Sequence, residues 1–338
     1  MIVYYTYLKY LAFAVVAASL PVIGLIVLKF IQKFSAGKVK SLVCLSGKTA
    51  IVTGGCSGIG FETALVLASR GARVIIADRK DATKAKNKII EITHNTNIET
   101  KHLDLTSLQS VRKFAKEING TEERLDILIN NAGVGTVGNK HTDDGLHSTM
   151  QINHFGPFLL THLLTDLLKK SAPSRIIFVS SVYAFCSNLT LDNLNYPQGH
   201  PLSLFRTSLI YGNSKLANII AANGFAERLK EYGITSNSLH PGLINTSIYV
   251  KSAKYLGLQS LARLFRNIFL FAYGKTPEEG AQTTIHLALS NKLKDVTGKH
   301  FWDCRMFPMP LSAWNKKFCD DIWEKSEQLV ELKPEERL

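Results

Sequence analysis

The stretch that decides the fold is Thr53–Gly60, which reads Thr-Gly-Gly-Cys-Ser-Gly-Ile-Gly. It follows an apolar run at 49–52 and precedes a helical pattern over 58–70, so we expect a turn between a β-strand and an α-helix. Glycine suits such a turn because it tolerates positive φ and lets backbone N–H groups approach a ligand closely. A diphosphate is then stabilised at the helix N-terminus. Asp78, at the end of the next apolar run, strengthens the prediction of a nucleotide-binding turn.

Strand and helix patterns alternate along the chain after this turn. Strands are predicted at 49–53, 73–77, 99–103, 127–130, 175–180 and 235–240, and helices at 58–70, 82–93, 108–118, 149–170 and 212–232. This alternation predicts an α/β fold with a Rossmann-type doubly wound parallel sheet, whose ligands bind beyond the carboxyl ends of the strands. Polar residues fall at or just past six of those ends: Thr53, Asp78, Asp104, Asn131, Ser181 and His240. Their convergence predicts one ligand cleft.

The length and composition fit one large α/β domain or two small ones, and the distribution of charge favours a membrane surface as partner. The chain has 338 residues, 46% of them hydrophobic, and a formal net charge of +13, so it is able to bury a substantial core. Residues 1–47 hold five lysines and no acid, and residues 232–277 also lack acidic side chains. One cluster flanks an apolar span and the other lies on an amphipathic stretch, so we expect membrane lipid and no nucleic acid as partner. The five cysteines are scattered without a Cys-x-x-Cys pair, which argues against a metal site.

The N-terminal segment predicts a membrane anchor over residues 8–31. Leu11–Leu28 is uncharged and, with its flanks, is long enough to cross the hydrocarbon core as a transmembrane helix. A cleaved signal peptide is the alternative, but the run is long for one and its small residues fall inside it. Pro21 leaves open a hairpin that dips into one leaflet. Four lysines follow the span, so the positive-inside rule places the domain after the basic linker, 32–46, in the cytosol.

Tyr211 and Lys215 are predicted to share one face of a helix, because they stand at i and i+4. The ammonium group favours phenolate and lowers the pKa of the tyrosine, which then acts as acid or base nearer neutral pH. Ser181 offers a hydroxyl to a substrate oxygen, with Ser180 as its rival, since strand alternation leaves only one of them facing the site. Asn153 either holds a water chain to Lys215 or marks a local irregularity of its helix.

Asp78 and Arg79 argue in opposite directions about the cofactor. The carboxylate of Asp78 is placed to accept hydrogen bonds from both ribose hydroxyls of an adenosine and would repel a 2′-phosphate. Arg79 would attract that phosphate. The sequence therefore leaves NAD and NADP open, with a lean toward NAD.

Taken together, these motifs resemble the short-chain dehydrogenase/reductase superfamily over residues 47–300. The motifs are Thr-Gly-x-x-x-Gly-Ile-Gly at 53–60, Asn-Asn-Ala-Gly at 130–133, Asn153, Ser181, Tyr211-x-x-x-Lys215 and His-Pro-Gly at 240–242. The resemblance implies an enzyme in which Tyr211 exchanges a proton with the substrate oxygen and Ser181 positions that oxygen. It also implies that Lys215 lowers the pKa of the tyrosine and binds the nicotinamide ribose, and that Asn153 completes a proton relay.

The same resemblance implies a cofactor site for NAD or NADP. Asn131 would support the adenosine side, Asp104 the adenine and Thr246 the nicotinamide carboxamide. The implied cofactor-binding set is Thr53, Gly54, Ser57, Gly58, Ile59, Gly60, Asp78, Arg79, Asp104, Leu105, Asn131, Ala132, Gly133, Tyr211, Lys215, Pro241, Gly242 and Thr246.

A narrower resemblance is to the retinol dehydrogenase-like, membrane-anchored branch. It rests on the N-terminal span, on Lys-Thr-Pro-Glu-Glu-Gly-Ala-Gln-Thr at 275–283, on Gly-Lys-His-Phe-Trp-Asp-Cys at 298–304 and on the thirty-residue gap between Ser181 and Tyr211. The branch implies a hydrophobic alcohol or carbonyl substrate, retinol or retinal first, with polyprenols, sterols and fatty aldehydes as alternatives. It implies the endoplasmic reticulum membrane, or else a lipid droplet or mitochondrial membrane. Many retinal-reducing members carry a small residue where this chain has Asp78 and prefer NADPH.

The remaining segments complete the predicted organisation. A catalytic domain spans 47–300, with a C-terminal extension over 301–338. Apolar residues follow helical spacing within 243–275, which predicts either a substrate lid that touches the membrane or an ordinary core-facing helix. A homodimer is left open, and a non-catalytic NAD(P)-binding scaffold is the alternative of another class.

Overall fold

The computed structural model describes residues 24, 26–27, 29, 33, 37–39, 41–135, 137–197, 203–244 and 274–338. Most of the expected anchor, Thr246 and the expected lid apart from its ends lie outside these residues. No helix within the described part of the chain is long and apolar enough to cross a bilayer.

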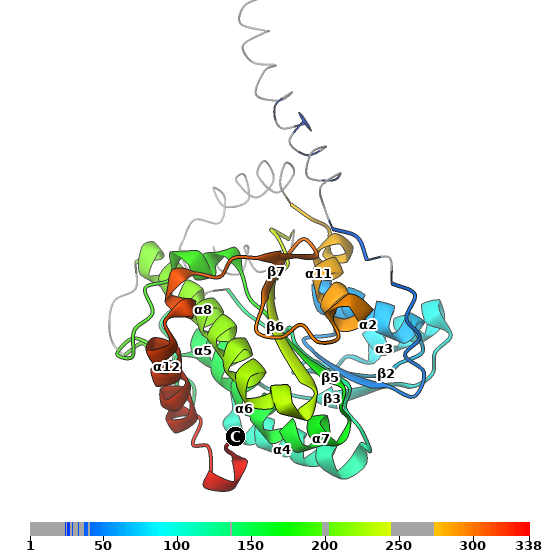
Figure 1. The fold of residues 1–338 in the computed structure, drawn as a ribbon, viewed down its shortest axis with the longest axis horizontal. Helices are drawn as coiled ribbons and strands as arrows, with labels where there is room; N and C mark the ends of the chain where they lie inside the picture. Colours follow the sequence, from blue (N-terminus) through cyan, green and yellow to red (C-terminus); the bar gives the residue numbers. More distant parts are fainter. Residues whose placement is uncertain are drawn as a thin grey trace, which may run out of the picture.

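The described residues form an eight-stranded sheet in the order β3-β2-β1-β4-β5-β6-β7-β8 (Figure 1). Its strands are β1 (Thr49–Thr53), β2 (Arg73–Asp78), β3 (Ile98–His102), β4 (Ile127–Asn130), β5 (Ser174–Val179), β6 (Ile234–His240), β7 (His300–Trp302) and β8 (Arg305–Phe307). All neighbouring pairs are parallel except β7 with β8. The chain order reverses between β1 and β4, and this switch point is where an open α/β sheet binds its ligand. The predicted doubly wound parallel sheet is thus confirmed.

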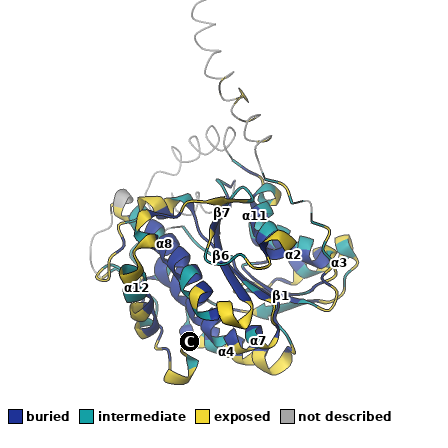
Figure 2. Cartoon of the chain, viewed as in Figure 1, coloured by how far each residue is buried: buried dark blue, intermediate teal, exposed yellow. Residues whose placement is uncertain are grey.

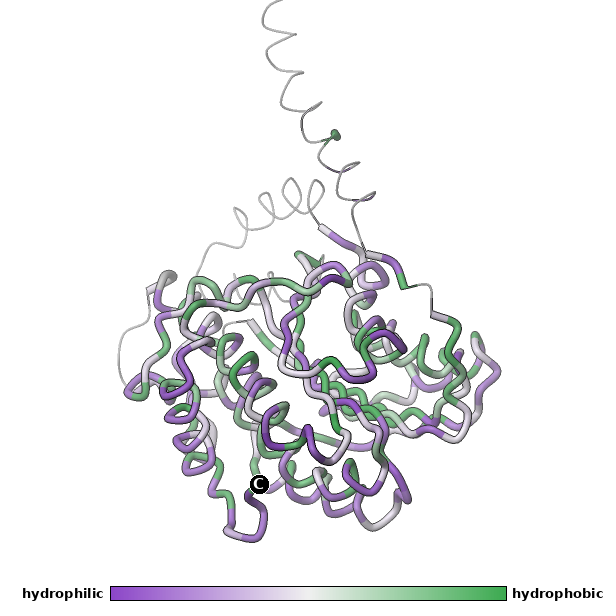
Figure 3. The backbone as a smooth tube through the Cα atoms, in the orientation of Figure 1, coloured by the Kyte–Doolittle hydropathy of each residue, from purple (hydrophilic) through white to green (hydrophobic). Residues whose placement is uncertain are grey.

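Helices cover both faces of the sheet because the strands are apolar on both sides. Ala50, Val52 and Ile76 belong to a core shared with α2 (Gly58–Ser69), α3 (Thr83–Thr93) and α11 (Pro277–Leu289). Ile51 and Ile75, which alternate with them, belong to a core shared with α4 (Leu108–Thr121), α6 (Gly156–Leu163), α8 (Leu204–Leu229) and α12 (Lys316–Leu329). The central strands and α8 are mostly buried (Figure 2), whereas β8 is exposed. Hydrophobic tracts follow the strands, while polar residues gather at the outer turns (Figure 3).

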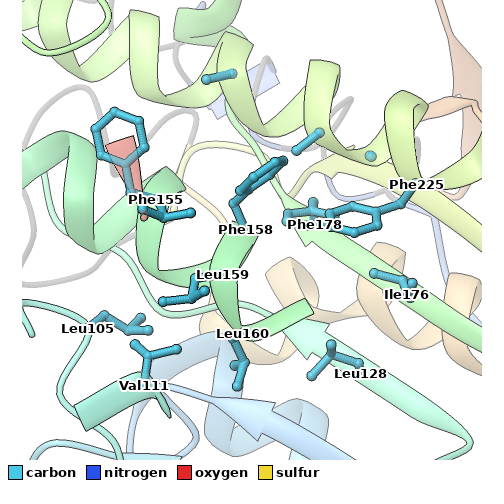
Figure 4. Packing of buried hydrophobic residues seen from close by; sticks show 14 of the residues in the cluster. Leu105, Val111, Leu128, Phe155, Phe158, Leu159, Leu160, Ile176, Phe178 and Phe225 are labelled. Carbon is cyan, nitrogen blue, oxygen red and sulfur yellow. The ribbon is translucent and has the colours of Figure 1, made fainter. Parts of the chain in front are cut away.

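An aromatic cluster fixes α12 against the second face. The rings of Phe158 and Phe225 lie 5.7 Å apart between α6 and α8, and Phe178 of β5 stacks on Phe225 at 5.9 Å (Figure 4). Trp323 of α12 packs edge-on at 4.8 Å from both Phe158 and Phe225. The C-terminal extension is therefore part of the hydrophobic core of the catalytic domain.

Two predicted helices differ from the structure. The expected helix at 149–170 is divided into α5 (Ser148–Met150), a π-helical turn (η1, Gln151–Phe155), α6 and α7 (Thr165–Lys170). The expected helix at 212–232 begins earlier, at Leu204, where the Ser203 side chain accepts a hydrogen bond from the Arg206 N–H at 3.3 Å. Serine is a favoured N-cap because its oxygen satisfies such a free N–H.

Short 3₁₀ turns follow β5 (η2, Val182–Cys186), α8 (η3, Lys230–Tyr232), α11 (η4, Asn291–Leu293) and β8 (η5, Leu311–Trp314), and η6 (Pro334–Glu336) lies near the C-terminus.

Candidate active site

The glycine-rich turn between β1 and α2 has a backbone that only glycine adopts easily. Gly54 and Gly58 have φ of 66° and 59°, in the left-handed region that is costly for other residues. A Cβ placed on Gly60 would lie 2.3 Å from the Gly54 carbonyl oxygen. Glycine at position 60 therefore lets the turn pack closely against the first turn of α2, and a helix N-terminus of this kind favours a bound diphosphate.

Thr53 and Asn131 join the glycine turn to the end of β4. The Thr53 Oγ1 accepts hydrogen bonds from the N–H groups of Asn131 and Ala132, both at 2.9 Å. The Asn131 side-chain amide in turn donates to the Thr53 carbonyl oxygen at 2.8 Å. The predicted residues at these two strand ends therefore form one network, in which Asn131 supports the turn itself.

Asp78 and Asp104 end the two strands on the far side of β1. The carboxylate of Asp78 accepts hydrogen bonds from the Cys56 N–H at 3.4 Å and from the Lys80 N–H at 3.0 Å, so it faces the glycine turn, while Arg79 is exposed. The carboxylate of Asp104 accepts from the backbone N–H and the hydroxyl of Thr106, at 2.9 and 2.7 Å. Both carboxylates thus sit along the edge where the adenosine half of a dinucleotide would lie.

Asn153 lies in the π-helical turn η1 and is completely buried. Its Oδ1 accepts a hydrogen bond from the Val134 N–H at 2.8 Å, and its Nδ2 donates to the Val134 carbonyl oxygen at 2.9 Å and to the Ser214 Oγ at 3.0 Å. The wider π-helical turn directs the Asn153 amide toward the segment after β4. Single π-helical turns within α-helices are frequent at functional sites. The expected helix irregularity at Asn153 is thus present, while the water chain from Asn153 to Lys215 stays a prediction.

Lys215 is buried at the centre of this region. Its Nζ donates a hydrogen bond to the Val179 carbonyl oxygen at 3.0 Å, and burial lowers its pKa to about 8 because desolvation disfavours the charged amine. A Cβ on Gly133 would lie 3.2 Å from the Lys215 Nζ and 3.3 Å from the Asn153 Oδ1. Gly133 therefore leaves room in front of these two polar groups, where a Cβ would intrude.

Tyr211 lies on α8, and Ser180 and Ser181 directly follow the end of β5. The Ser180 hydroxyl donates to the Lys215 carbonyl oxygen at 2.7 Å and is thus engaged by the backbone of α8, whereas the role of Ser181 at the substrate oxygen stays a prediction. Ser181 caps the 3₁₀ turn η2, and Tyr183 of that turn packs edge-on against the ring of Tyr211 at 5.7 Å. Tyr211 is half-buried, with its ring centroid 5.8 Å from the Lys215 Nζ.

Pro241 and Gly242 follow the carboxyl end of β6. Gly242 has a φ of 92°, and a Cβ there would lie 2.8 Å from the Lys275 side chain. Lys275 is buried and forms an ion pair with Asp303, in the turn between β7 and β8. Both residues lie in the motifs at 275–283 and 298–304, but nothing in the sequence indicates that they pair, because the contact joins segments far apart in the chain.

The residues fit a nicotinamide dinucleotide. The glycine turn would hold its diphosphate, Asp78 the adenosine ribose, and Lys215 the nicotinamide ribose in the space that Gly133 leaves open. One predicted member, Thr246, lies outside the described residues. Tyr183, whose ring lies beside that of Tyr211, was not predicted from the sequence, although it stands two residues after Ser181.

Comparisons with known proteins agree with this geometry. Residues 48–191 match the family model of short chain dehydrogenases. The chain is 40% identical to retinol dehydrogenase 11 of Mus musculus over 318 residues, covering 93% of this chain and 96% of that protein. It is 41% identical to the short-chain dehydrogenase TIC 32 A, chloroplastic, of Brassica napus over 298 residues, covering 85% and 89%. A crystal structure of an uncharacterized protein from Mycobacterium Paratuberculosis has a TM-score of 0.67 at 28% identity, covering 88% of this chain and 98% of that one.

The chain belongs to the short-chain dehydrogenase/reductase family, in its retinol dehydrogenase-like branch. It is accordingly an NAD(P)-dependent oxidoreductase that acts on alcohols.

Proposed function

We propose that this protein interconverts a hydrophobic alcohol and its carbonyl, with retinol and retinal as the first candidates. The observation that carries the proposal is the buried Lys215 beneath the half-buried ring of Tyr211, next to the turn that Ser181 begins. The likeness to a retinol dehydrogenase over nearly the whole chain supports the retinoid class. Polyprenols, sterols and fatty aldehydes are the other members of the same chemical class.

In the proposed reaction the bound nicotinamide supplies or accepts the hydride at the substrate carbon. In the reducing direction, Tyr211 donates its phenolic proton to the carbonyl oxygen, and Ser181 holds that oxygen by a hydrogen bond. The positive charge of Lys215 stabilises the phenolate that is left. Asn153 and Lys215 both border the space above Gly133, where a water chain would return the proton to Tyr211.

For the cofactor we propose a preference for NAD over NADP. The supporting observation is that the Asp78 carboxylate is held facing the glycine turn by two backbone N–H groups. A carboxylate there accepts hydrogen bonds from the ribose hydroxyls and repels a 2′-phosphate. Arg79 is exposed and is the residue that would favour NADP in the opposite case.

We further propose that the protein is anchored in the endoplasmic reticulum membrane by residues 8–31, with the catalytic domain in the cytosol and a lid within 243–275. Leu11–Leu28 has no charged residue and is followed by four lysines before Ser41, which supports this orientation. Protease protection in sealed microsomes tests it: a catalytic domain that resists protease added outside the vesicles contradicts the cytosolic placement.

The function itself is tested with the full chain in detergent micelles. All-trans-retinol and retinal, a polyprenol and its aldehyde, a sterol and a fatty aldehyde are assayed in parallel with NAD(H) and NADP(H). We expect turnover of the retinoid pair with the highest kcat/KM and a preference for NAD(H). If only another lipid is turned over, that lipid replaces retinol and retinal as the proposed substrate. If the protein binds the cofactor but turns over none of these lipids, the result supports a non-catalytic scaffold.

A further inference from the structure

Four large apolar side chains remain exposed on two neighbouring elements beside the proposed catalytic residues. Tyr183 and Phe185 of η2 are 38% and 43% exposed, and Met306 and Phe307 of β8 are 64% and 36% exposed. The rings of Phe185 and Phe307 meet edge-on with centroids 6.0 Å apart, so the two elements form one surface. We call these four residues the apolar rim. Contiguous exposed apolar surface of this kind marks a binding site more often than scattered single residues do.

The rim is built on a fixed support. The η2 backbone packs so closely on α8 that a Cβ on Gly212 would lie 2.7 Å from the Tyr183 carbonyl oxygen. Just after η2, the Asn213 Oδ1 accepts hydrogen bonds from the Ser187 hydroxyl at 2.7 Å and from the Asn188 N–H at 3.0 Å. These contacts hold Tyr183 and Phe185 in place, and they leave much of the two rings uncovered within the described structure.

The rim spans the two halves of the reaction centre. At one end, the ring of Tyr183 contacts Tyr211 at 5.7 Å, and Ser181 stands two residues earlier in the chain. At the other end, Trp302 contacts Phe307 at 4.9 Å and His240 at 5.0 Å, and His240 directly precedes the Pro241–Gly242 loop. A molecule lying on the rim would therefore reach from the proposed proton donor, Tyr211, toward the segment that precedes the Pro241–Gly242 loop.

The charges of these elements identify the chemistry of such a molecule. Within η2 and β8, the only charged side chain is Arg305. The four rim side chains themselves carry no charge, and a surface of three aromatic rings and a thioether gains free energy by removing apolar atoms from water. The ligand portion that suits it is uncharged and apolar.

We propose that the apolar rim is the subsite for the hydrocarbon tail of the substrate, and that Phe185 and Phe307 determine the preference for long apolar alcohols and aldehydes. This inference rests on the proposed function and deepens it, since it assigns residues to substrate length. The tail lies across η2 and β8 while the oxygen is held at Ser181 and Tyr211.

The first test compares straight-chain aldehydes of four and ten carbons, with the full-length enzyme at one fixed detergent concentration. A fully buried methylene raises kcat/KM by about fourfold, so we expect wild type to prefer decanal strongly over butanal. The ratio of the two kcat/KM values should fall at least tenfold in the Phe185→Ser/Phe307→Ser double variant. Because both enzymes meet the same detergent, partition of the aldehydes cancels in the comparison.

Tyr232→Ser is the matched control, since Tyr232 is a 52% exposed ring in η3, before the amino end of β6, whereas the rim lies toward the carboxyl end of that strand. This variant should keep the wild-type ratio, and Phe185→Leu/Phe307→Leu should restore most of the decanal preference. An unchanged ratio in the serine double variant, or an equal fall in Tyr232→Ser, overturns the proposal.

A binding measurement separates this inference from the proposed reaction. A brominated decanol should quench tryptophan fluorescence saturably because Trp302 borders the rim, and the serine double variant should bind it at least fivefold more weakly. If the wild-type enzyme binds the brominated decanol but reduces neither aldehyde, and the serine double variant has lost this binding, the result supports the rim and contradicts the proposed reaction. Quenching that is the same in wild type and variant contradicts the rim whatever the turnover.

Discussion

At the scale of a single residue, the buried charge of Lys215 serves the proposed reaction but lowers the stability of the fold. Burial lowers its pKa from 10.5 to about 8, so holding the protonated amine in the folded protein at neutral pH costs about 3 kcal/mol. The unfolded chain binds this proton more tightly, so the cost is complete below pH 8 and disappears as the pH rises toward 10.5. Such a cost is common for a group retained for its charge.

We therefore expect Lys215→Met to remove turnover and yet to stabilise the fold. At pH 7 the free energy of unfolding should rise by about 2 kcal/mol, because the hydrogen bond to the Val179 carbonyl oxygen is lost at the same time. The gain should shrink between pH 8 and 10. Urea unfolding of both proteins across this range measures the difference. A variant that is less stable than wild type at pH 7 contradicts the desolvation argument.

Tyr211→Phe removes one oxygen atom and keeps the ring that packs on Tyr183. Under the proposed mechanism kcat should fall by a factor of about 10² to 10⁴, which is the usual contribution of a positioned acid or base. The dissociation constant of NADH, measured by fluorescence titration, should stay within about twofold because Lys215 and the glycine turn are unchanged. Wild-type turnover in this variant would remove Tyr211 from the reaction.

Asp78→Ala tests the proposed cofactor preference. The change removes the carboxylate that faces the glycine turn, and with it the repulsion of a 2′-phosphate next to Arg79. We expect the ratio of kcat/KM for NADPH over NADH to rise at least tenfold, and Arg79→Ala to lower the same ratio. If wild type already prefers NADPH strongly, Arg79 rather than Asp78 decides the preference.

At the scale of elements, local sequence was enough for the strands and the glycine turn. β1 and β4 occupy the predicted residues because each is a short apolar run that is bounded by polar or turn residues. The sequence left a local irregularity at Asn153 open, but it did not predict a π-helical turn over Gln151–Phe155, because that turn depends on the hydrogen bonds that join Asn153 to Val134 and Ser214. Helical periodicity carries no information about such partners.

The C-terminal helix α12 shows the same limit. The apolar face of α12 can be recognised in the sequence. The position at which α12 packs on α8, however, depends on a glycine, whose lack of a side chain makes room for the other helix. Gly224 lies in α8 beneath Trp323, and a Cβ there would approach the indole ring to 2.3 Å. Only the folded structure reveals that this glycine is a contact surface for a helix about a hundred residues away.

Gly224→Ala should therefore destabilise the protein although alanine is the better helix former. Overpacking against Trp323 is expected to cost about 1–3 kcal/mol. Gly120, near the end of α4, is the matched control, because nothing lies within 4 Å of a Cβ placed there. Gly120→Ala should raise the free energy of unfolding by about 0.5–1 kcal/mol. Thermal unfolding of the two variants compares them directly. A change of the same sign in the free energy of unfolding of both variants would contradict the packing argument.

At the scale of the whole molecule, the site is assembled from strand ends that the topology brings to one edge. The sequence predicted this edge because each strand end carried a polar residue. It did not predict the apolar rim, since β7 and β8 are three-residue strands with no periodicity of their own. Their pairing is imposed by β6 and by the ion pair of Lys275 with Asp303. Chemistry at strand ends was therefore predictable, whereas the surface that selects the substrate was not.

Five buried histidines make the whole fold sensitive to acid. Burial lowers the pKa of each below its usual value of 6.5, to about 3 or 4: His147, His154, His162, His240 and His300. The folded protein keeps them neutral, while the unfolded chain takes up their protons as the pH falls below 6.5. Each histidine then lowers the free energy of unfolding by up to about 1.4 kcal/mol per pH unit.

We expect cooperative acid unfolding between about pH 6 and 4, since stabilities of about 5–15 kcal/mol are exhausted within two pH units of that slope. Urea midpoints at pH 7, 6 and 5 measure the slope. His154→Gln should reduce it by about one proton, because His154 packs neutral against α12, with its Nε2 2.9 Å from the Ser326 Oγ. A slope that is equal in wild type and His154→Gln would mean that carboxylates, and not buried imidazoles, set the acid limit of the fold.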